Sequence, residues 1–212
     1  MPRMSSPSPL ARLPRAAWRR ARAFAHHQET YVWLTLALHG DRERRALPDG
    51  VTLRSGTAED RPALEETGGP EPWRLEEHLR EGDLWIAEEP GIPLFSCWIF
   101  RRRTPMFGWT DLPENIVCLE HSATAAAARG RGVAPGAWSA IADALQENGV
   151  HAMITKVLDT NVPSLRAVGK AGFRETCRMH VIRTGPWERV RFEPHEDPLA
   201  RELGKAVDRA RR

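Results

Sequence analysis

The 212-residue sequence has few cysteines, few lysines, one tyrosine and no long apolar run. Its three cysteines, Cys97, Cys118 and Cys177, are widely spaced and form no CxxC pair, which argues against a disulfide framework and a zinc knuckle. We therefore expect a reducing, cytoplasmic setting and no bound metal. The best apolar run, YVWLTLAL at 31–38, is much shorter than the roughly 18 residues of a membrane-spanning helix.

Positive charge is concentrated at the N-terminus. Residues 1–50 contain nine arginines and four acidic residues, whereas the remaining 162 residues carry a net charge of about −2. A main domain without excess positive charge argues against nucleic acid as its partner. Residues 1–28 contain six arginines and no acid, and three interpretations stay open for them. They are a solvated or packing helix, a basic helix at the periphery of an anionic membrane or partner, or a targeting segment.

The composition divides the chain into three segments. Residues 1–48 are predicted to be a basic N-terminal extension, with a disordered Pro/Ser-rich start and a helical stretch from about Leu10 to Leu38. The polar linker HGDRERRALPDG then marks a boundary. Residues 49–195 alternate short strands with helices, and residues 196–212 are predicted to be a C-terminal helical tail.

The apolar periodicity of the middle segment predicts a mixed fold. Strands are predicted at 51–57, 83–89, 93–103, 116–124, 151–158, 176–183 and 187–194, and helices at 58–67, 72–82, 135–147 and 161–173. The clearest helix begins at Pro135 and has Trp138, Ile141 and Leu145 on one face. The strand–helix–strand crossover over 116–157 makes its two strands parallel within a mostly antiparallel sheet.

The segment ARGRGVAPGAW, at 128–138, places glycines and arginines between a strand and this helix. A helix N-terminus carries unsatisfied N–H groups and partial positive charge, and glycines let a ligand approach the backbone closely. The segment therefore predicts a phosphate site. It has neither the Lys-Ser/Thr pair of a P-loop nor a full GxGxxG motif.

This segment resembles motif A of the GNAT superfamily of acyl-CoA-dependent N-acyltransferases. The family signature Arg/Gln-x-x-Gly-x-Gly/Ala is matched by residues 129–134, and NVPSLRAVGKAGF, at 161–173, is similar to the family's second cofactor segment. The resemblance covers about residues 50–192. It implies an α/β (α+β) GNAT fold with a mixed, mostly antiparallel sheet, splayed parallel fourth and fifth strands and helices on both faces. The chain would add an extra N-terminal helix.

The resemblance implies that acyl-CoA, most often acetyl-CoA, donates its acyl group to a primary amine by direct attack in a ternary complex. The loop before the helix would hold the pyrophosphate, the end of the 116–124 strand would pair with the pantetheine arm, and the amide of the second segment would bind that arm. The cofactor-binding residues are then Ser122, Thr124, Arg129, Gly130, Arg131, Gly132, Val133, Ala134, Asn161 and Ser164.

Glu120 is the candidate general base, at a position where the family often has one. An amine with a pKa near 10 is mostly protonated at neutral pH, so a carboxylate or a water chain normally removes its proton. Strand alternation places Glu120 on one face with Cys118 and Ser122. It places His121 on the opposite face, which makes His121 the less favoured base.

The chain departs from the family at the general acid. Many members have a tyrosine near the end of the second segment, where this chain has Val168-Gly169, and its only tyrosine, Tyr31, falls in the extension. Ser164 or water is then the candidate proton donor to the leaving thiolate. The alternative function is a non-catalytic acyl-CoA-binding or interaction module that lacks the general acid.

The acceptor is barely specified. Trp73, Phe107 and Trp109 lie in the irregular segments where the family builds its acceptor pocket, and are the candidate substrate-binding residues. A small-molecule amine and a peptide amine stay open as acceptors, as do a monomer and a homodimer. The Arg101-Arg102-Arg103 run is interpreted as a solvated strand end, with an anionic acceptor or the 3′-phosphate of CoA as alternatives.

Overall fold

The chain is described by a computed structural model over residues 26–69, 72–194 and 196–211. Its strands are β1 (His26–Ala37), β2 (Thr52–Ser55), β3 (Gly82–Glu89), β4 (Ile92–Phe100), β5 (Arg103–Thr104), β6 (Thr110–Asp111), β7 (Ile116–Thr124), β8 (Ala152–Leu158), β9 (Arg174–Thr184) and β10 (Trp187–Glu193). Its α-helices are α2 (Arg61–Thr67), α3 (Leu75–Glu81), α4 (Val133–Glu147), α5 (Val162–Lys170) and α6 (Pro198–Ala210). Short 3₁₀ turns precede α2, α3 and α4.

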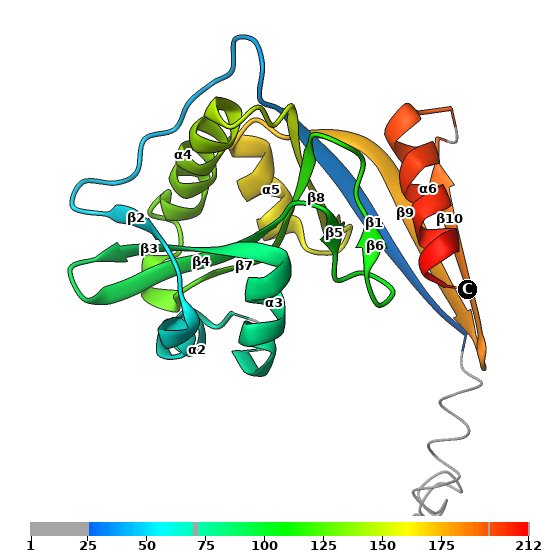
Figure 1. Cartoon of the computed structure of the whole chain (residues 1–212), viewed down its shortest axis with the longest axis horizontal. Coiled ribbons are helices and arrows are strands. Elements are labelled where there is room, and N and C mark those ends of the chain that lie inside the picture. The colour runs from blue at the N-terminus through cyan, green and yellow to red at the C-terminus, as the bar shows by residue number, and fades with distance from the viewer. Residues whose placement is uncertain (1–25, 70–71, 195, 212) are drawn as a thin grey trace, which may run out of the picture.

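An eight-stranded sheet in the order β10-β9-β1-β8-β7-β4-β3-β2 forms the centre of the molecule (Figure 1). β7 and β8 are parallel, and the other neighbouring strands of this sheet are antiparallel. β5 and β6 form a separate two-stranded sheet within the segment between β4 and β7. The predicted mixed, mostly antiparallel sheet with one parallel pair is therefore confirmed.

β1 is the main correction to the sequence prediction. The helix expected from Leu10 to Leu38 is wrong for residues 26–37, which form a strand between β8 and β9 (Figure 1). The earlier part of that predicted helix lies outside the described residues. β1 pairs with β8 from Tyr31↔Leu158 onwards and with β9 from His26↔Thr184 onwards. Residues 26–37 thus belong to the central sheet and not to a separate helical extension.

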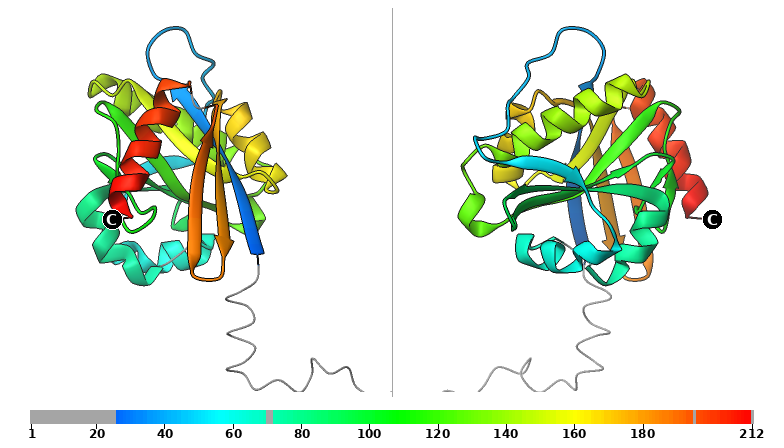
Figure 2. Two further views of the ribbon diagram at one scale, coloured as in Figure 1. Left: turned by 90° about the vertical axis from the view of Figure 1, so that its right-hand side faces the viewer. Right: turned by 60° about the vertical axis from the view of Figure 1, so that its left-hand side comes forward.

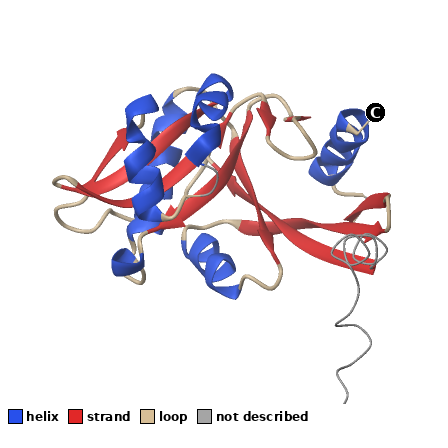
Figure 3. Ribbon diagram, turned by 90° about the horizontal axis from the view of Figure 1, so that it is seen from below, coloured by secondary structure: helices blue, strands red, loops and turns tan. Residues whose placement is uncertain are grey.

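Helices cover both faces of the sheet, as expected (Figure 3). α4 and α5 pack over one core, which includes Phe95 and Ile141. α2, α3 and α6 pack over the other, which includes Trp98 and Leu203. No helix in the described ranges is long and apolar enough to span a bilayer.

The C-terminal helix is an integral part of the second core. α6 begins at Pro198, after Asp197, whose carboxylate accepts the Ala200 N–H over 3.0 Å as a cap. Its buried side chains, Leu203 and Val207 among them, face the β9–β10 hairpin, over which the helix lies (Figure 2). The predicted helix is therefore confirmed, and it packs firmly instead of trailing from the domain.

Candidate functional site

A large cavity opens where β7 and β8 separate. The two strands pair only as far as Leu119↔Thr155, although β7 continues to Thr124 and β8 to Leu158. At that last pair the Thr155 hydroxyl donates to the Leu119 carbonyl over 2.8 Å, which fixes the point of divergence. Beyond it, the facing backbone groups of the two strands are open to an extended ligand. The predicted separation of the two parallel strands, β7 and β8, is therefore confirmed.

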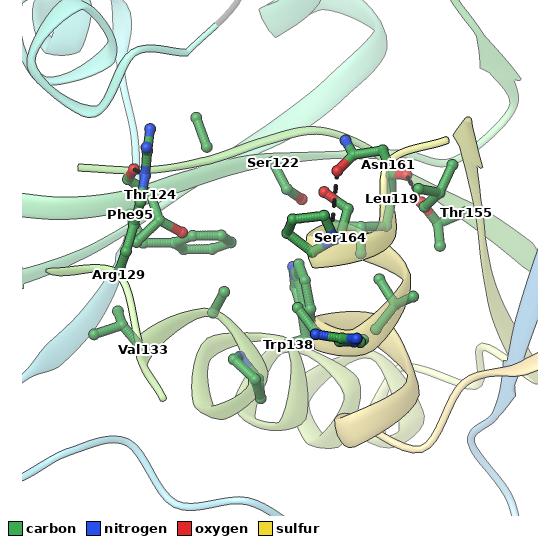
Figure 4. Close-up of a pocket in the computed structure, with 18 of the residues that line it drawn as sticks. Phe95, Leu119, Ser122, Thr124, Arg129, Val133, Trp138, Thr155, Asn161 and Ser164 are labelled. Carbon is green, nitrogen blue, oxygen red and sulfur yellow. Dashed lines mark hydrogen bonds between the residues drawn. The ribbon is translucent and has the colours of Figure 1, made fainter. Parts of the chain in front are cut away.

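The cavity has a volume of about 830 Å³ and lies between the splayed strands and the N-terminal ends of α4 and α5 (Figure 4). Trp138 of α4 and Phe95 of β4 give it an apolar wall. Glu120 also lines it, together with all but one of the predicted cofactor residues: Ser122, Thr124, Arg129, Gly130, Gly132, Val133, Ala134, Asn161 and Ser164. The exception is Arg131, which forms an ion pair with Glu89.

The loop before α4 has the backbone shape that its glycines allow. Gly130 and Gly132 have φ angles of 79° and 83°, in the left-handed region that glycine adopts without strain. Gly132 is the N-cap of α4, and no side chain caps the helix. The backbone N–H groups of Val133 and Ala134, at the start of the helix, have no intrahelical acceptor, so they are available to an anion in the cavity.

The second cofactor segment forms the opposite wall. Asn161 is the N-cap of α5, and its Oδ1 accepts the backbone N–H of Ser164 over 3.3 Å (Figure 4). Capping uses the carbonyl half of the amide only. The Asn161 Nδ2 has no recorded partner within the described chain, so it can donate to a ligand. The Ser164 side chain lies beside it on the same wall.

Glu120 is held in a buried ion pair with Lys156, a residue that the sequence prediction missed. Glu120 is 9% exposed, and its Oε1 contacts the Lys156 ammonium and accepts the Thr104 hydroxyl over 2.9 Å. Burial alone would raise the pKa of Glu120, but the Lys156 ammonium and its other neighbours lower it below the usual 4.5. Burial lowers the pKa of Lys156, but the Glu120 carboxylate, with smaller contributions from Cys118 and Tyr31, raises it above the usual 10.5 overall. Both groups are therefore charged at neutral pH.

His121 lies on the same face as Glu120, so the prediction of opposite faces is wrong. Glu120 pairs with Trp98 and Ala123 pairs with Ser96. Between these pairs β7 has two residues, His121 and Ser122, and β4 has only one, so β7 forms a bulge there. His121 has a φ of 51°, and this bulge turns its ring to stack on His78 at 5.2 Å between centroids. A bulge breaks strict alternation, and alternation was the basis of the prediction.

Tyr31 lines the cavity, although the sequence assigned it to an extension. It lies on β1 opposite Leu158, next to the splayed end of β8. Its hydroxyl donates to Glu29 over 3.2 Å, and burial together with Glu29 raises the pKa of the phenol above its usual 10. The phenol is therefore protonated at neutral pH and adds a proton donor to the cavity wall.

The predicted acceptor residues are not brought to this cavity. Trp73 is 72% exposed, and neither Phe107 nor Trp109 lines this cavity. Both pack against the core beneath α3 and α6, and the Trp109 Nε1 donates to Glu77 over 3.3 Å. Their assignment to the acceptor stays a prediction.

Comparisons with known proteins identify the fold and the family. Residues 53–173 match the acetyltransferase (GNAT) family, and no curated protein matches the sequence. Solved GCN5-related N-acetyltransferases from Sphaerobacter thermophilus and Kribbella flavida are each 16% identical to the chain, with TM-scores of 0.55 and 0.54. A Drosophila protein is also 16% identical, with a TM-score of 0.56.

These structures cover most of the chain, but the chain covers only part of them. The alignments span 80%, 76% and 78% of this chain and 55%, 60% and 54% of the Sphaerobacter, Kribbella and Drosophila chains, respectively. At such identities they show the fold alone. The family match extends from β2 to the end of α5 and so contains the splayed strands and both cofactor segments. The chain belongs to the GNAT acetyltransferase family, whose members are acyl-CoA-dependent acyltransferases.

Proposed function

We propose that the chain transfers an acyl group, with acetyl as the first candidate, from CoA to a primary amine within a ternary complex. The observation that carries the proposal is one continuous cavity that joins the open strand edges of β7 and β8 to the uncapped N-terminus of α4. A pantetheine arm has amide groups that can pair with strand backbone, and a pyrophosphate suits a helix N-terminus. The cavity therefore matches an elongated ligand with an anionic end.

The chemistry at the other end of the cavity requires proton removal from the amine and proton delivery to the thiolate. We assign the first role to Glu120, whose recorded partners within the described chain all meet Oε1 and leave Oε2 for the amine or a water. Ser164 stays the candidate donor to the thiolate, and Tyr31 becomes a second one because it lines the same cavity and keeps its proton at neutral pH.

Binding and turnover test the proposal. A hundredfold excess of acetyl-CoA over its Kd should stabilise the fold by about 3 kcal/mol, seen as a raised melting temperature. A panel of amines should then yield acylated products by mass spectrometry. Binding without product for any amine would favour the non-catalytic module, and no stabilisation at millimolar acetyl-CoA would remove the proposal altogether.

Two variants at one position show whether the α4 N-terminus holds the anion. Asn and Asp tolerate the left-handed backbone of Gly132 better than other residues do, and the two have nearly the same shape. Gly132→Asp should weaken acetyl-CoA binding at least tenfold more than Gly132→Asn, because a carboxylate repels the pyrophosphate. Equal affinities, measured by titration calorimetry, would place the pyrophosphate elsewhere.

The cysteines of the native protein should not contribute to the signal of a thiol-release assay. Cys97, Cys118 and Cys177 are at most 1% exposed, and burial raises the pKa of all three thiols, that of Cys177 to about 12. We expect no reaction of the native protein with dithionitrobenzoate and three reactive thiols per chain in denaturant. Colour released during turnover then reports CoA alone. Rapid labelling of the native chain would contradict the burial of these residues.

A further inference from the structure

A second, smaller cavity adjoins the α4 N-terminus. It has a volume of about 320 Å³, and Gly132, Pro135 and Lys170 line both this cavity and the larger one. Arg131 and the segment between β1 and β2 complete its wall. That segment includes Arg45 and lies outside the matched family region. We call this segment, residues 38–51, the connector. In Figure 1 it runs past α4 on the way to β2.

The connector is fixed tightly against α4. Arg42 forms an ion pair with Asp143, and its side chain is only 6% exposed. The Arg42 guanidinium also donates to the Ser139 carbonyl over 3.3 Å. The backbone N–H of Arg45 donates to the Ser139 hydroxyl over 2.9 Å. A Cβ at Gly136 would lie 2.7 Å from the Ala46 carbonyl oxygen, so only glycine permits this approach. The cavity wall is thus a positioned element of the fold.

The lining of the second cavity is strongly basic. Arg45, Arg131 and Lys170 contribute to it from the connector, the loop before α4 and the end of α5, and no carboxylate does. The Arg45 Nε donates to the Lys170 carbonyl over 3.2 Å, which joins the connector to α5. Arg45 and Arg131 have partners in Glu43 and Glu89, whereas Lys170 has no recorded ion-pair partner in the part of the chain that is described. Lys170 is therefore the cation most available to a ligand.

We propose that this cavity binds the 3′-phosphate of the CoA whose pyrophosphate lies against the α4 N-terminus. The inference rests on the proposed function and deepens it. In CoA the 3′-phosphate is carried by the same ribose as the pyrophosphate, so it must lie a few bonds from the loop. The shared residues Gly132 and Pro135 place the basic cavity within that reach. A phosphate monoester is a dianion near neutral pH and suits converging cations.

The structure also disfavours the Arg101-Arg102-Arg103 run for this role. Arg101 forms an ion pair with Asp83 over 2.8 Å, and Arg103 forms one with Glu81. None of the three residues lines either of the two cavities at the α4 N-terminus. Arg101→Ala therefore serves as a control that removes an exposed arginine far from the proposed phosphate.

The test compares CoA with 3′-dephospho-CoA by titration calorimetry. The unmodified protein should bind CoA about tenfold more tightly, as expected for one well-placed charged contact. Lys170→Ala and Arg45→Ala should each bring this ratio close to one while leaving the affinity for 3′-dephospho-CoA unchanged. Arg101→Ala should keep the ratio. Lys170→Ala removes no recorded side-chain contact, so its unliganded melting temperature should not change.

The outcomes separate the two proposals. Equal affinities for CoA and 3′-dephospho-CoA in the unmodified protein would overturn this inference and leave the acyl-CoA site in place. A tenfold ratio that survives both Lys170→Ala and Arg45→Ala would also overturn it, because the phosphate would then lie elsewhere. Failure to bind either ligand would instead overturn the proposed function, on which the inference rests.

Discussion

A chain that begins at residue 49 is expected to show no cooperative thermal transition, because it lacks β1. β1 lies between β8 and β9 and pairs with both along most of its length. Its Trp33 belongs to one core and its Leu34 to the other, so both cores lose buried surface at once. Without β1, the β9–β10 hairpin would have no neighbour in the sheet. Circular dichroism during heating, with a chain that begins at residue 26 as the control, measures the loss.

A point substitution in β1 should cause a smaller, measurable loss of stability. Trp33 is fully buried, and Trp33→Ala is expected to lower the free energy of unfolding by about 3–5 kcal/mol. The exposed Gln28 lies on the same strand, and Gln28→Ala should change it by less than about 0.5 kcal/mol. A chain from residue 49 that melts like the full chain would show that β1 is dispensable.

Glu120→Gln is expected to lower both stability and activity. It removes the carboxylate that neutralises the buried Lys156 ammonium, and breaking such a pair costs about 3–5 kcal/mol of unfolding free energy. If Glu120 is also the base, kcat should fall by about 10²- to 10⁴-fold. Denaturant titration and initial rates at saturating acetyl-CoA measure the two effects.

The double variant Glu120→Gln/Lys156→Met separates structure from chemistry. It removes both charges and keeps the side-chain lengths, so it should recover most of the stability that Glu120→Gln loses. Its kcat should stay as low as that of Glu120→Gln, because no base has been restored. If kcat recovers together with the stability, Glu120 has a structural role only and is not the base.

Lowering the pH should reduce the stability of the unmodified protein more than that of the double variant. The folded pKa of Glu120 lies below the 4.5 of an unfolded chain, so its contribution to stability is complete above pH 4.5 and declines as the pH falls through the folded value. The double variant lacks this contribution. The difference in unfolding free energy between the two proteins should therefore shift in favour of the double variant below pH 4.5.

Much of the fold after residue 50 was predictable because its patterns are local. The strand at 116–124 has the predicted bounds, and α4 buries Trp138, Ile141 and Leu145 as their spacing indicates. β1 was not predictable in the same way. Its apolar run follows a stretch rich in alanine and arginine that favours a helix, and both of its partner strands lie in the second half of the chain. Tertiary pairing therefore decided its conformation.

In the candidate site, too, local patterns were predictable from the sequence, and features that depend on tertiary structure were not. The loop at 128–138 could be recognised from its closely spaced glycines, Gly130 and Gly132, whose left-handed φ angles the structure shows. Lys156 was missed because its partner Glu120 lies on another strand, although a rare lysine inside an apolar strand was a usable signal. His121 was misplaced because a positive φ in a non-glycine residue leaves no mark on the sequence.

Because of its place in the sheet, β1 cannot pair with its neighbours until late in synthesis. β1 leaves the ribosome before the other strands of the described sheet, yet its partners Leu158 and Thr184 are added much later. Until then an apolar strand has both of its hydrogen-bonding edges unsatisfied, a state prone to pairing with other chains. Such distant pairing slows folding. In the nascent chain, residues 26–37 are therefore open to such mispairing until β8 and β9 have been made.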